Sequence, residues 1–234
     1  MAGLGFPCTN RPLTGSCNKI SSPRTPRLRV RLETGFKTAH CPGLRLSTKP
    51  AKRSPVLRID QTVLVVVDVQ GKLAQLMFER DRLFEQLQRL ARGAQALQLP
   101  VLLTEQNPAR MGGTIEELRA LLPGVTAIPK MSFGCGGEPT FMQQLEALRR
   151  RQVLLVGIET HVCVFQTAAQ LVEKLIEVQV VADAVSSRTE TNYRLGLERI
   201  RAAGATLTSV ESALFELMGT ADHPAFRTVL GIVK

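Results

Sequence analysis

The sequence feature that most constrains the fold is the apolar run TVLVVVD, Thr62–Asp68. A strand with one face in solvent alternates apolar and polar side chains, whereas this run is apolar without interruption from Val63 to Val67. A continuous, mostly β-branched run of this length is typical of a strand covered on both faces, as in a parallel sheet between two layers of helices.

The rest of the chain contains the further strands and helices that such a sheet requires. Similar apolar runs predict strands at 100–106, 125–130, 152–157, 178–184 and 205–209. Helical spacing of apolar residues predicts intervening helices at 79–98, 114–123, 139–151, 162–175 and 188–204, and a closing helix that begins at Ser209 or Ser212. This alternation predicts right-handed βαβ units and a three-layer α/β/α fold with a mainly parallel, six-stranded, Rossmann-like sheet.

Residues 1–55 differ sharply in composition from residues 56–234, so we expect a leader followed by one domain. The leader holds 11 Lys or Arg and one acid, whereas the remaining residues hold 19 basic and 19 acidic side chains. The formal charge of +10 therefore belongs to the leader. The neutral domain is not expected to bind nucleic acid, although the leader alone leaves salt-sensitive DNA or RNA binding as an alternative.

The leader is rich in Arg, Ser and Thr and contains 7 of the 13 prolines. This composition is typical of an organellar transit peptide, and we expect a mitochondrial destination, with a plastid as the alternative. If the segment is only a disordered basic tail, we expect the cytoplasm. We expect no membrane partner, since no apolar run approaches the ~18 residues of a membrane span.

Five predicted strands end in polar or reactive side chains, and the carboxyl ends of parallel strands share one edge of the sheet. The first two strands end at Asp68–Gln70 and Glu105–Gln106, and the third ends at Lys130. The fourth is followed by Glu159–Cys163, and the fifth by Asp183–Arg188. A carboxylate, an amine and a thiol are therefore expected to meet at this edge.

These groups form a set suited to acyl transfer. A helix start and the charge of Lys130 are expected to lower the pKa of the Cys163 thiol, and Asp68 could accept its proton. Backbone N–H groups in the turn before Cys163 could stabilise an oxyanion. Each residue also has a purely structural interpretation: Cys163 as a core side chain, Asp68 as a helix cap and Lys130 as a surface residue.

Other chemistries fit the sequence less well. The segment CVFQTAAQ has neither the arginine of a phosphatase loop nor the second cysteine of a thioredoxin motif, and the turn DVQGKL lacks G-x-G-x-x-G. His161 is expected to point away from Cys163, and His223 to cap the last helix. The sequence predicts neither a cofactor nor a metal site.

The segments VVVDVQ, IPKMSF and GIETHVCV together resemble the isochorismatase-like cysteine hydrolase superfamily. TEQNP, DAVSSR and HPAFRTVLGIVK resemble its branch of isochorismatase domain-containing proteins. The resemblance implies a catalytic triad of Asp68, Lys130 and Cys163. It also implies a cis peptide at Ile158–Glu159 and an oxyanion hole formed by the N–H groups of Glu159 and Cys163.

The resemblance further implies a small-molecule substrate and a homo-oligomer. The bond cleaved would be an amide or a related bond, with a vinyl ether as the variant. Metal-dependent nicotinamidases of the superfamily carry histidines after the second strand, where this chain reads TEQNPARMGG, so no metal is expected. The competing hypothesis is a catalytically silent binding or scaffold protein that has kept the fold.

Several residues near the predicted site carry secondary interpretations. Gln70, Gln106 and Phe133 are candidates for substrate binding. Glu105 is equally suited to a structural and a functional role. The loop SFGCGGE, 132–138, is expected to be a flexible connection, with closure over the site as the alternative and Cys135 as a bystander. Helix caps are predicted at Thr114, as a capping box with Glu117, and at Ser186 and Ser187, with substrate contact as the alternative for the two serines.

Overall fold

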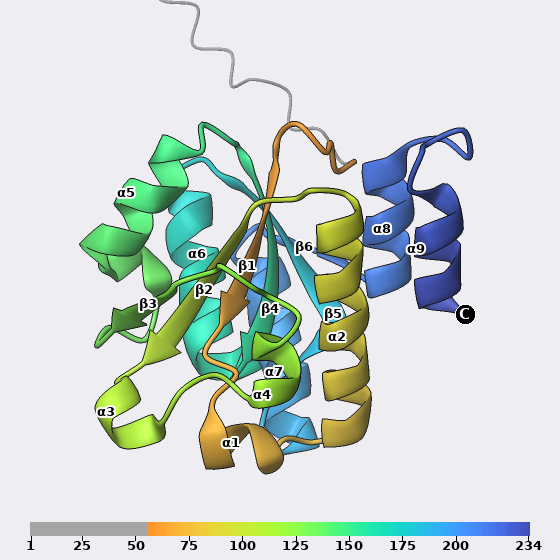
Figure 1. Cartoon of the computed structure of the whole chain (residues 1–234). Coiled ribbons are helices and arrows are strands. Elements are labelled where there is room, and N and C mark those ends of the chain that lie inside the picture. Colours follow the sequence, from red (N-terminus) through yellow and green to blue (C-terminus); the bar gives the residue numbers. More distant parts are fainter. Residues whose placement is uncertain (1–55) are drawn as a thin grey trace, which may run out of the picture. The chain divides into compact units, whose positions relative to one another are not determined.

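The structure, a computed structural model, describes residues 56–234, so the predictions for residues 1–55 lie outside the described part. Its six strands form one sheet in the order β3-β2-β1-β4-β5-β6 (Figure 1), and all neighbours are parallel. The strands are β1 (Thr62–Val67), β2 (Val101–Gln106), β3 (Ala127–Lys130), β4 (Gln152–Ile158), β5 (Glu177–Ser186) and β6 (Thr206–Thr208). The predicted fold class is confirmed, with a fully parallel sheet.

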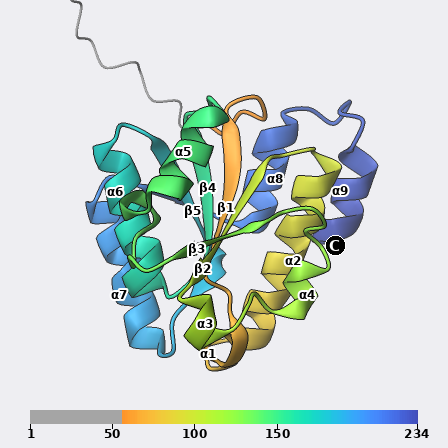
Figure 2. The same cartoon turned by 60° about the vertical axis from the view of Figure 1, so that its left-hand side comes forward.

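Helices cover both faces of this sheet (Figures 1 and 2). One layer contains α2 (Arg80–Ala96), α4 (Glu116–Arg119), α8 (Val210–Met218) and α9 (Phe226–Val233), and the other contains α5 (Pro139–Ala147), α6 (Phe165–Glu173) and α7 (Glu190–Ala202). Among the described residues, no helix has the length and apolarity needed to cross a bilayer.

Strand β1 shows why the sheet needs two helical layers. All six of its residues are buried. Val63, Val65 and Val67 pack in the core with α5, α6 and α7, whereas Leu64 and Val66 pack with α2 and α8. Because successive side chains of a strand point to opposite faces, an unbroken apolar run fills both cores, as the sequence predicts.

The predicted capping box at Thr114 is wrong. The residue that precedes α4 is Ile115, and α4 has no side-chain cap. The backbone N–H and the hydroxyl of Thr114 both donate to Oε1 of Glu105, each at 2.8 Å. A buried carboxylate needs hydrogen-bond donors. Glu105 therefore uses the donors of Thr114, and its structural role is observed directly.

The predicted caps at Ser186 and Ser187 are also wrong, because α7 begins later than the sequence indicates. Its cap is Thr189, whose hydroxyl accepts the N–H of Asn192 at 3.2 Å. The Ser186 hydroxyl donates to the carbonyl of Phe78 at 2.6 Å instead. The carbonyl of Ser187 accepts the N–H of Phe78 at 2.8 Å, so both serines bind the segment before α2 and neither caps a helix.

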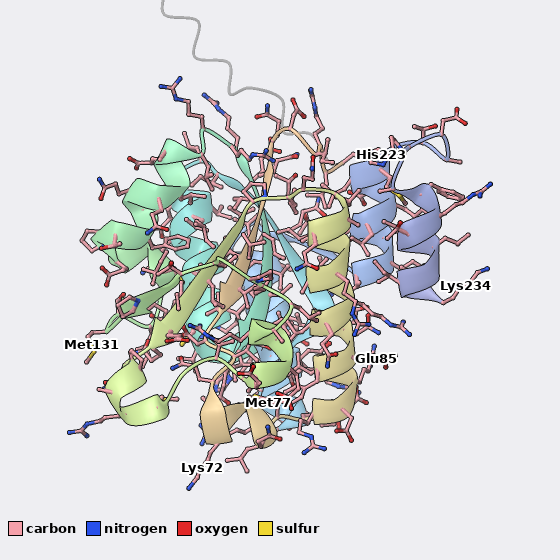
Figure 3. All side chains as sticks on the ribbon, viewed as in Figure 1. Lys72, Met77, Glu85, Met131, His223 and Lys234 are labelled. Carbon is pink, nitrogen blue, oxygen red and sulfur yellow. The ribbon has the colours of Figure 1, made fainter. Side chains whose placement is uncertain are left out.

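Two short helices that the sequence reading missed lie beside the carboxyl ends of β1 and β2 (Figure 1). They are α1 (Gly71–Gln75) and α3 (Pro108–Met111), and neither is long enough to show a helical period. At the other end of the chain, His223 lies just before α9 (Figure 3), and its Nδ1 accepts the N–H of Ala225 at 3.1 Å. Because α9 has no side-chain cap, the predicted capping role of His223 is wrong.

Candidate active site

The site is built around a buried ion pair between the ends of β1 and β3. Lys130 Nζ lies 2.6 Å from Asp68 Oδ2, and both side chains are almost completely buried. Asp68 follows the last residue of β1 in a left-handed backbone conformation, φ 53°, which aspartate tolerates better than most residues. The sheet topology thus brings together two residues that are 62 positions apart in the sequence.

Each member of the ion pair is held by further hydrogen bonds. The Thr104 hydroxyl, fully buried in β2, donates to Asp68 Oδ1 at 2.8 Å. The Lys130 ammonium donates to Gln106 Oε1 at 2.7 Å, and to the carbonyls of Phe133 and Ser132 at 2.9 and 3.1 Å. Four oxygens therefore surround an ammonium group that has three N–H bonds.

The turn that carries Cys163 begins at the end of β4. Gly157 has φ +115°, and a Cβ there would lie 2.1 Å from the carbonyl oxygen of Val67, so only glycine fits. The Ile158–Glu159 peptide that follows is cis, as the family resemblance implies. Cys163 then lies within a π-helical turn, Thr160–Val164, that leads directly into α6. Such single π turns occur frequently at functional sites.

The turn is fixed from outside by Glu159 and Arg188. The Glu159 carboxylate accepts the backbone N–H and the side-chain Nε of Arg188, both at 3.1 Å. Glu159 is buried, whereas the Arg188 side chain is 56% exposed. The start of the turn is thereby tied to the segment between β5 and α7.

The pKa of Cys163 differs from the sequence prediction. Burial and the neighbouring Asp68 carboxylate raise the pKa of this thiol to about 12, although the charge of Lys130 lowers it. The prediction of a lowered pKa is wrong, for two reasons. The thiol is desolvated within a π turn instead of lying at the start of an α-helix, and Asp68 offsets the charge of Lys130.

Cys163 and Asp68 face a cavity of about 110 Å³. This is small beside the ~300–1,000 Å³ of typical ligand pockets. Gln106 and Glu159 also line the cavity, and the remaining lining side chains are all apolar: Leu73, Met111, Phe133, Ile158 and Val162. The cavity therefore has one thiol and two acidic residues in its lining, in mostly apolar surroundings.

The three candidates for substrate binding lie in different places. Gln106 and Phe133 line the cavity, and the Phe133 side chain is 55% exposed at its edge. Gln70 is fully buried, and its amide donates to the carbonyls of Gln106 and Gly112 and accepts the N–H of Gln106. In this structure Gln70 holds the main chain behind the cavity, away from the lining.

The loop at 132–138 is packed against α6, which differs from the predicted flexible connection. Its residues Cys135–Gly137 form a short 3-10 helix. The N–H of Cys135 donates to the Thr167 hydroxyl at 3.0 Å, and the Cys135 side chain is fully buried. A Cβ on Gly134 would lie 2.3 Å from Gln170 Oε1, so glycine permits this close packing.

Sequence reasoning missed several residues of the site. Leu73, Met111 and Val162 reach the cavity from the short helix α1, the short helix α3 and the π turn, which have no clear sequence signature. Thr104 is the one that the sequence could have indicated, because a fully buried polar residue inside a strand requires a partner.

His161 lies outside the cavity, as predicted. Its Nδ1 is 2.9 Å from the Ser187 hydroxyl. Asp183 also has a structural role, because its carboxylate accepts the N–H of Val210 at 3.0 Å, at the start of α8. Within residues 56–234, no group of three His, Cys, Asp or Glu side chains is arranged to hold a metal ion.

Comparison with known proteins identifies relatives over most of the described chain. Isc1 of Phytophthora sojae, described as a secreted isochorismatase effector, is 40% identical over 178 residues, which cover 74% of this chain and 84% of the relative. Isochorismatase domain-containing protein 2 of Bos taurus is 35% identical over 174 residues, covering 74% and 83%.

Solved structures with the same fold include two with broad coverage. MAR1 ribonuclease from Caenorhabditis elegans aligns with a TM-score of 0.72 at 34% identity, covering 76% of this chain and 92% of that one. YcaC from Pseudomonas aeruginosa aligns with a TM-score of 0.72 at 25% identity, covering 78% and 93%. The isochorismatase domain model matches residues 62–212, which contain every residue of the buried site. This chain belongs to the isochorismatase family.

Proposed function

We propose that this protein is a cysteine-dependent hydrolase that cleaves an amide or related bond in a small molecule. Cys163 is the nucleophile, and Asp68 accepts its proton. Lys130 forms an ion pair with Asp68 and keeps the carboxylate in position. The observation that carries the proposal is the buried Lys130–Asp68 ion pair at the same small cavity as the Cys163 thiol. Membership of the isochorismatase family, which includes hydrolases, supports the reaction class.

The raised pKa of Cys163 determines the first step. Because the resting thiol is protonated, its proton passes to Asp68 as the sulfur bonds to the substrate carbonyl carbon. The carbonyl oxygen becomes an oxyanion that accepts the N–H groups of Glu159 and Cys163. Collapse of this intermediate breaks the C–N bond, and Asp68 returns the proton to the leaving amine.

Hydrolysis of the resulting thioester uses the same groups. Water attacks the thioester carbon and gives one proton to Asp68. The second tetrahedral intermediate releases the carboxylic acid and the Cys163 sulfur, which takes its proton back from Asp68. Throughout both steps the charge of Lys130 offsets the negative charge that moves between Asp68 and the oxyanion.

The relatives of this chain support a reactive cysteine, and their names suggest a second kind of bond that the site could cleave. The YcaC structure from Pseudomonas aeruginosa is described with covalent acrylamide, and acrylamide is a reagent for thiolates. The relatives named for isochorismatase favour a vinyl ether as the alternative to an amide. The Caenorhabditis elegans neighbour is named a ribonuclease. RNA is a poor fit here, since the described cavity is small and no basic residue lines it.

The test is a screen of small amides, esters and vinyl ethers with the full chain, alongside Cys163→Ala and Cys163→Ser. Turnover by the wild type that both variants lose supports the proposal. Cys135→Ala is the matched control, because it removes the other described thiol, which does not line the cavity. Turnover of a substrate by Cys163→Ala at the wild-type rate would overturn it. Alkylation of Cys163 with no turnover would favour the silent binding protein.

Self-association is part of the proposal. Leu76, Met131 and Leu175 expose 62%, 70% and 78% of their surface, and Met131 projects from the end of β3 (Figure 3). Contact with a second copy of the chain would remove this apolar surface from water, which favours association. Light scattering of the purified chain tests this, and a mass equal to one chain would contradict it.

We also propose that residues 1–55 direct the chain to the mitochondrion. The proposal is supported only by the acid-poor, Arg-rich composition of that segment. N-terminal sequencing of the protein from isolated mitochondria tests it. Recovery only in the cytoplasm, with Met1 or Ala2 as the first residue, would contradict it.

A further inference from the structure

The charges around the cavity are paired among themselves. Among the described lining residues Asp68 and Glu159 are acidic, and none is lysine or arginine. Asp68 is paired with Lys130, and Glu159 is paired with Arg188. The two pairs are each neutral overall, so a bound ligand meets no uncompensated positive charge.

Lys130 is the cation nearest to the reacting groups, yet it has no donor left for a ligand. Its three N–H bonds donate to oxygens of Gln106, Ser132 and Phe133, and its charge is paired with that of Asp68. Its side chain is 0% exposed. A carboxylate on the substrate could reach this ammonium group only by displacing one of these partners.

The second cation of the site faces solvent. The Arg188 side chain is 56% exposed, and its Nε donates to Glu159 at 3.1 Å. Arg188 does not line the cavity, whereas Glu159 does. The charge of Arg188, outside the lining, is therefore compensated by Glu159, and it offers an anionic group in the cavity no free counterion.

We infer that this site takes uncharged small molecules, with a short apolar group beside the bond that is cleaved, and excludes substrates that carry a carboxylate. An anion loses its hydration in a cavity that offers no counterion, which is costly. A neutral amide loses much less hydration free energy on entering the cavity. Its apolar part contacts Leu73, Ile158 and Val162. This inference rests on the proposed function for the identity of the reacting thiol.

The charges of the cavity lining also favour an amide or ester bond over a vinyl ether. Isochorismate, the vinyl ether after which the family is named, is a dicarboxylate. Two carboxylates would enter a cavity whose described lining holds two acidic residues and no basic one. The neutral amide or ester is therefore the substrate class that fits this chain.

The first experiment compares two alkylating reagents of nearly equal size, iodoacetamide and iodoacetate, on the folded full chain. Peptide mapping by mass spectrometry follows Cys163 separately from the other cysteines. Cys163 in the urea-denatured chain supplies the reference, because it is the same thiol with the same sequence neighbours. Relative to that reference, we expect iodoacetate to lose at least about tenfold in rate against iodoacetamide. An unchanged ratio would overturn the inference.

A second measurement separates this inference from the proposed mechanism. Binding of isobutyramide and of isobutyrate to Cys163→Ala is followed by ligand-observed NMR, which requires no reactive thiol. We expect the amide to bind and the carboxylate to bind at least about tenfold more weakly. Equal binding, or binding of neither, would overturn the inference. If the amide binds but Cys163 reacts with neither reagent, the nucleophile is wrong and the charge selection stands.

A gain-of-function variant completes the test. Met111 lines the cavity from the end of α3, so Met111→Arg adds one unpaired cation to the lining. We expect it to raise the iodoacetate-to-iodoacetamide ratio at Cys163 by at least about tenfold. Met111→Gln, which is polar and uncharged, should leave the ratio within about twofold of the wild type. An equal effect of both variants would mean that the cavity does not select by charge.

Discussion

Two buried thiols lie near the Asp68–Lys130 ion pair, and they differ in access. Cys163 lines the cavity, whereas Cys135 is fully buried, and its sulfur lies 3.8 Å from the Thr104 hydroxyl. Burial raises the pKa of both, to about 12 for Cys163 and about 11 for Cys135. A lowered pKa therefore does not distinguish the thiol that we propose as the nucleophile.

The difference between the two thiols shows what this site requires of a nucleophile. Both feel the positive charge of Lys130 and the negative charge of Asp68. Only Cys163 shares a cavity with Asp68, where a substrate could bring the sulfur and the base into one reaction. Access to a base can replace a resting thiolate, because the proton then leaves during attack.

Removal of each thiol in turn should give the largest difference between the two cysteines. We expect Cys163→Ala to lower kcat/KM for a confirmed substrate by at least about 1,000-fold, because no other group in the cavity is a comparable nucleophile. Cys135→Ala should stay within about threefold of the wild type. Steady-state kinetics measures both, and thermal melts show that the variants are folded. A similar loss of kcat/KM in both variants would show that access to the cavity does not distinguish the two thiols.

The second prediction concerns the ion pair that both thiols share. Lys130→Met leaves the buried Asp68 carboxylate without its partner, so we expect the free energy of unfolding to fall by about 3–5 kcal/mol. Urea denaturation measures this change. The double variant Asp68→Asn with Lys130→Met removes both charges and should recover much of the loss. Additive losses in the double variant would show that the two charges do not stabilise each other.

The rate at which Cys163 is alkylated should depend strongly on pH. A thiol with a pKa near 12 gains thiolate about tenfold per pH unit, so alkylation of Cys163 should accelerate about a hundredfold between pH 8 and pH 10. A thiol at the free value of ~8.5 gains only about fourfold over that range. Iodoacetamide labelling with peptide mapping gives the rates. A plateau above pH 9 would mean that burial does not control the Cys163 thiol.

Much of this site could be predicted because topology alone determines it. Parallel strands that end in Asp68, Lys130 and the turn before Cys163 place these residues at one edge, whatever the details of packing. The order of strands and helices along the chain follows from hydrophobic periodicity instead. The cis peptide at Ile158–Glu159 came from family resemblance, because no property of these two residues in the sequence indicates it.

The predictions that failed depend on contacts between separate elements of the fold. The sequence predicts a local cap at Thr114, but the Glu105 carboxylate at the end of β2 accepts the hydrogen bonds of Thr114. The position of Cys163 along the chain predicts a lowered pKa, although burial by other elements raises it. Local patterns identify elements and edges, whereas partners and pKa shifts arise only when the elements pack.

The smallest expected effect concerns the loop that keeps Cys135 out of reach. Gly134 has φ −86°, which alanine adopts without strain, so Gly134→Ala tests side-chain contact alone. Its new Cβ would lie 2.3 Å from Gln170 Oε1 and 2.7 Å from Gln170 Cδ, and relief of this overlap must move the loop or the Gln170 side chain. We expect a loss of about 1–3 kcal/mol in urea denaturation and faster labelling of Cys135.

Two further variants show whether this contact is the cause. Gln170→Ala combined with Gly134→Ala removes the overlapping atoms and should restore both stability and protection of Cys135. Gly231→Ala, in α9, adds the same methyl group where nothing lies within 4 Å, and should be neutral or slightly stabilising. If Cys135 labels as slowly in Gly134→Ala as in the wild type, packing of this loop on α6 is not what separates the two thiols. The access difference would then depend on the burial of Cys135 against Thr104 and Thr167.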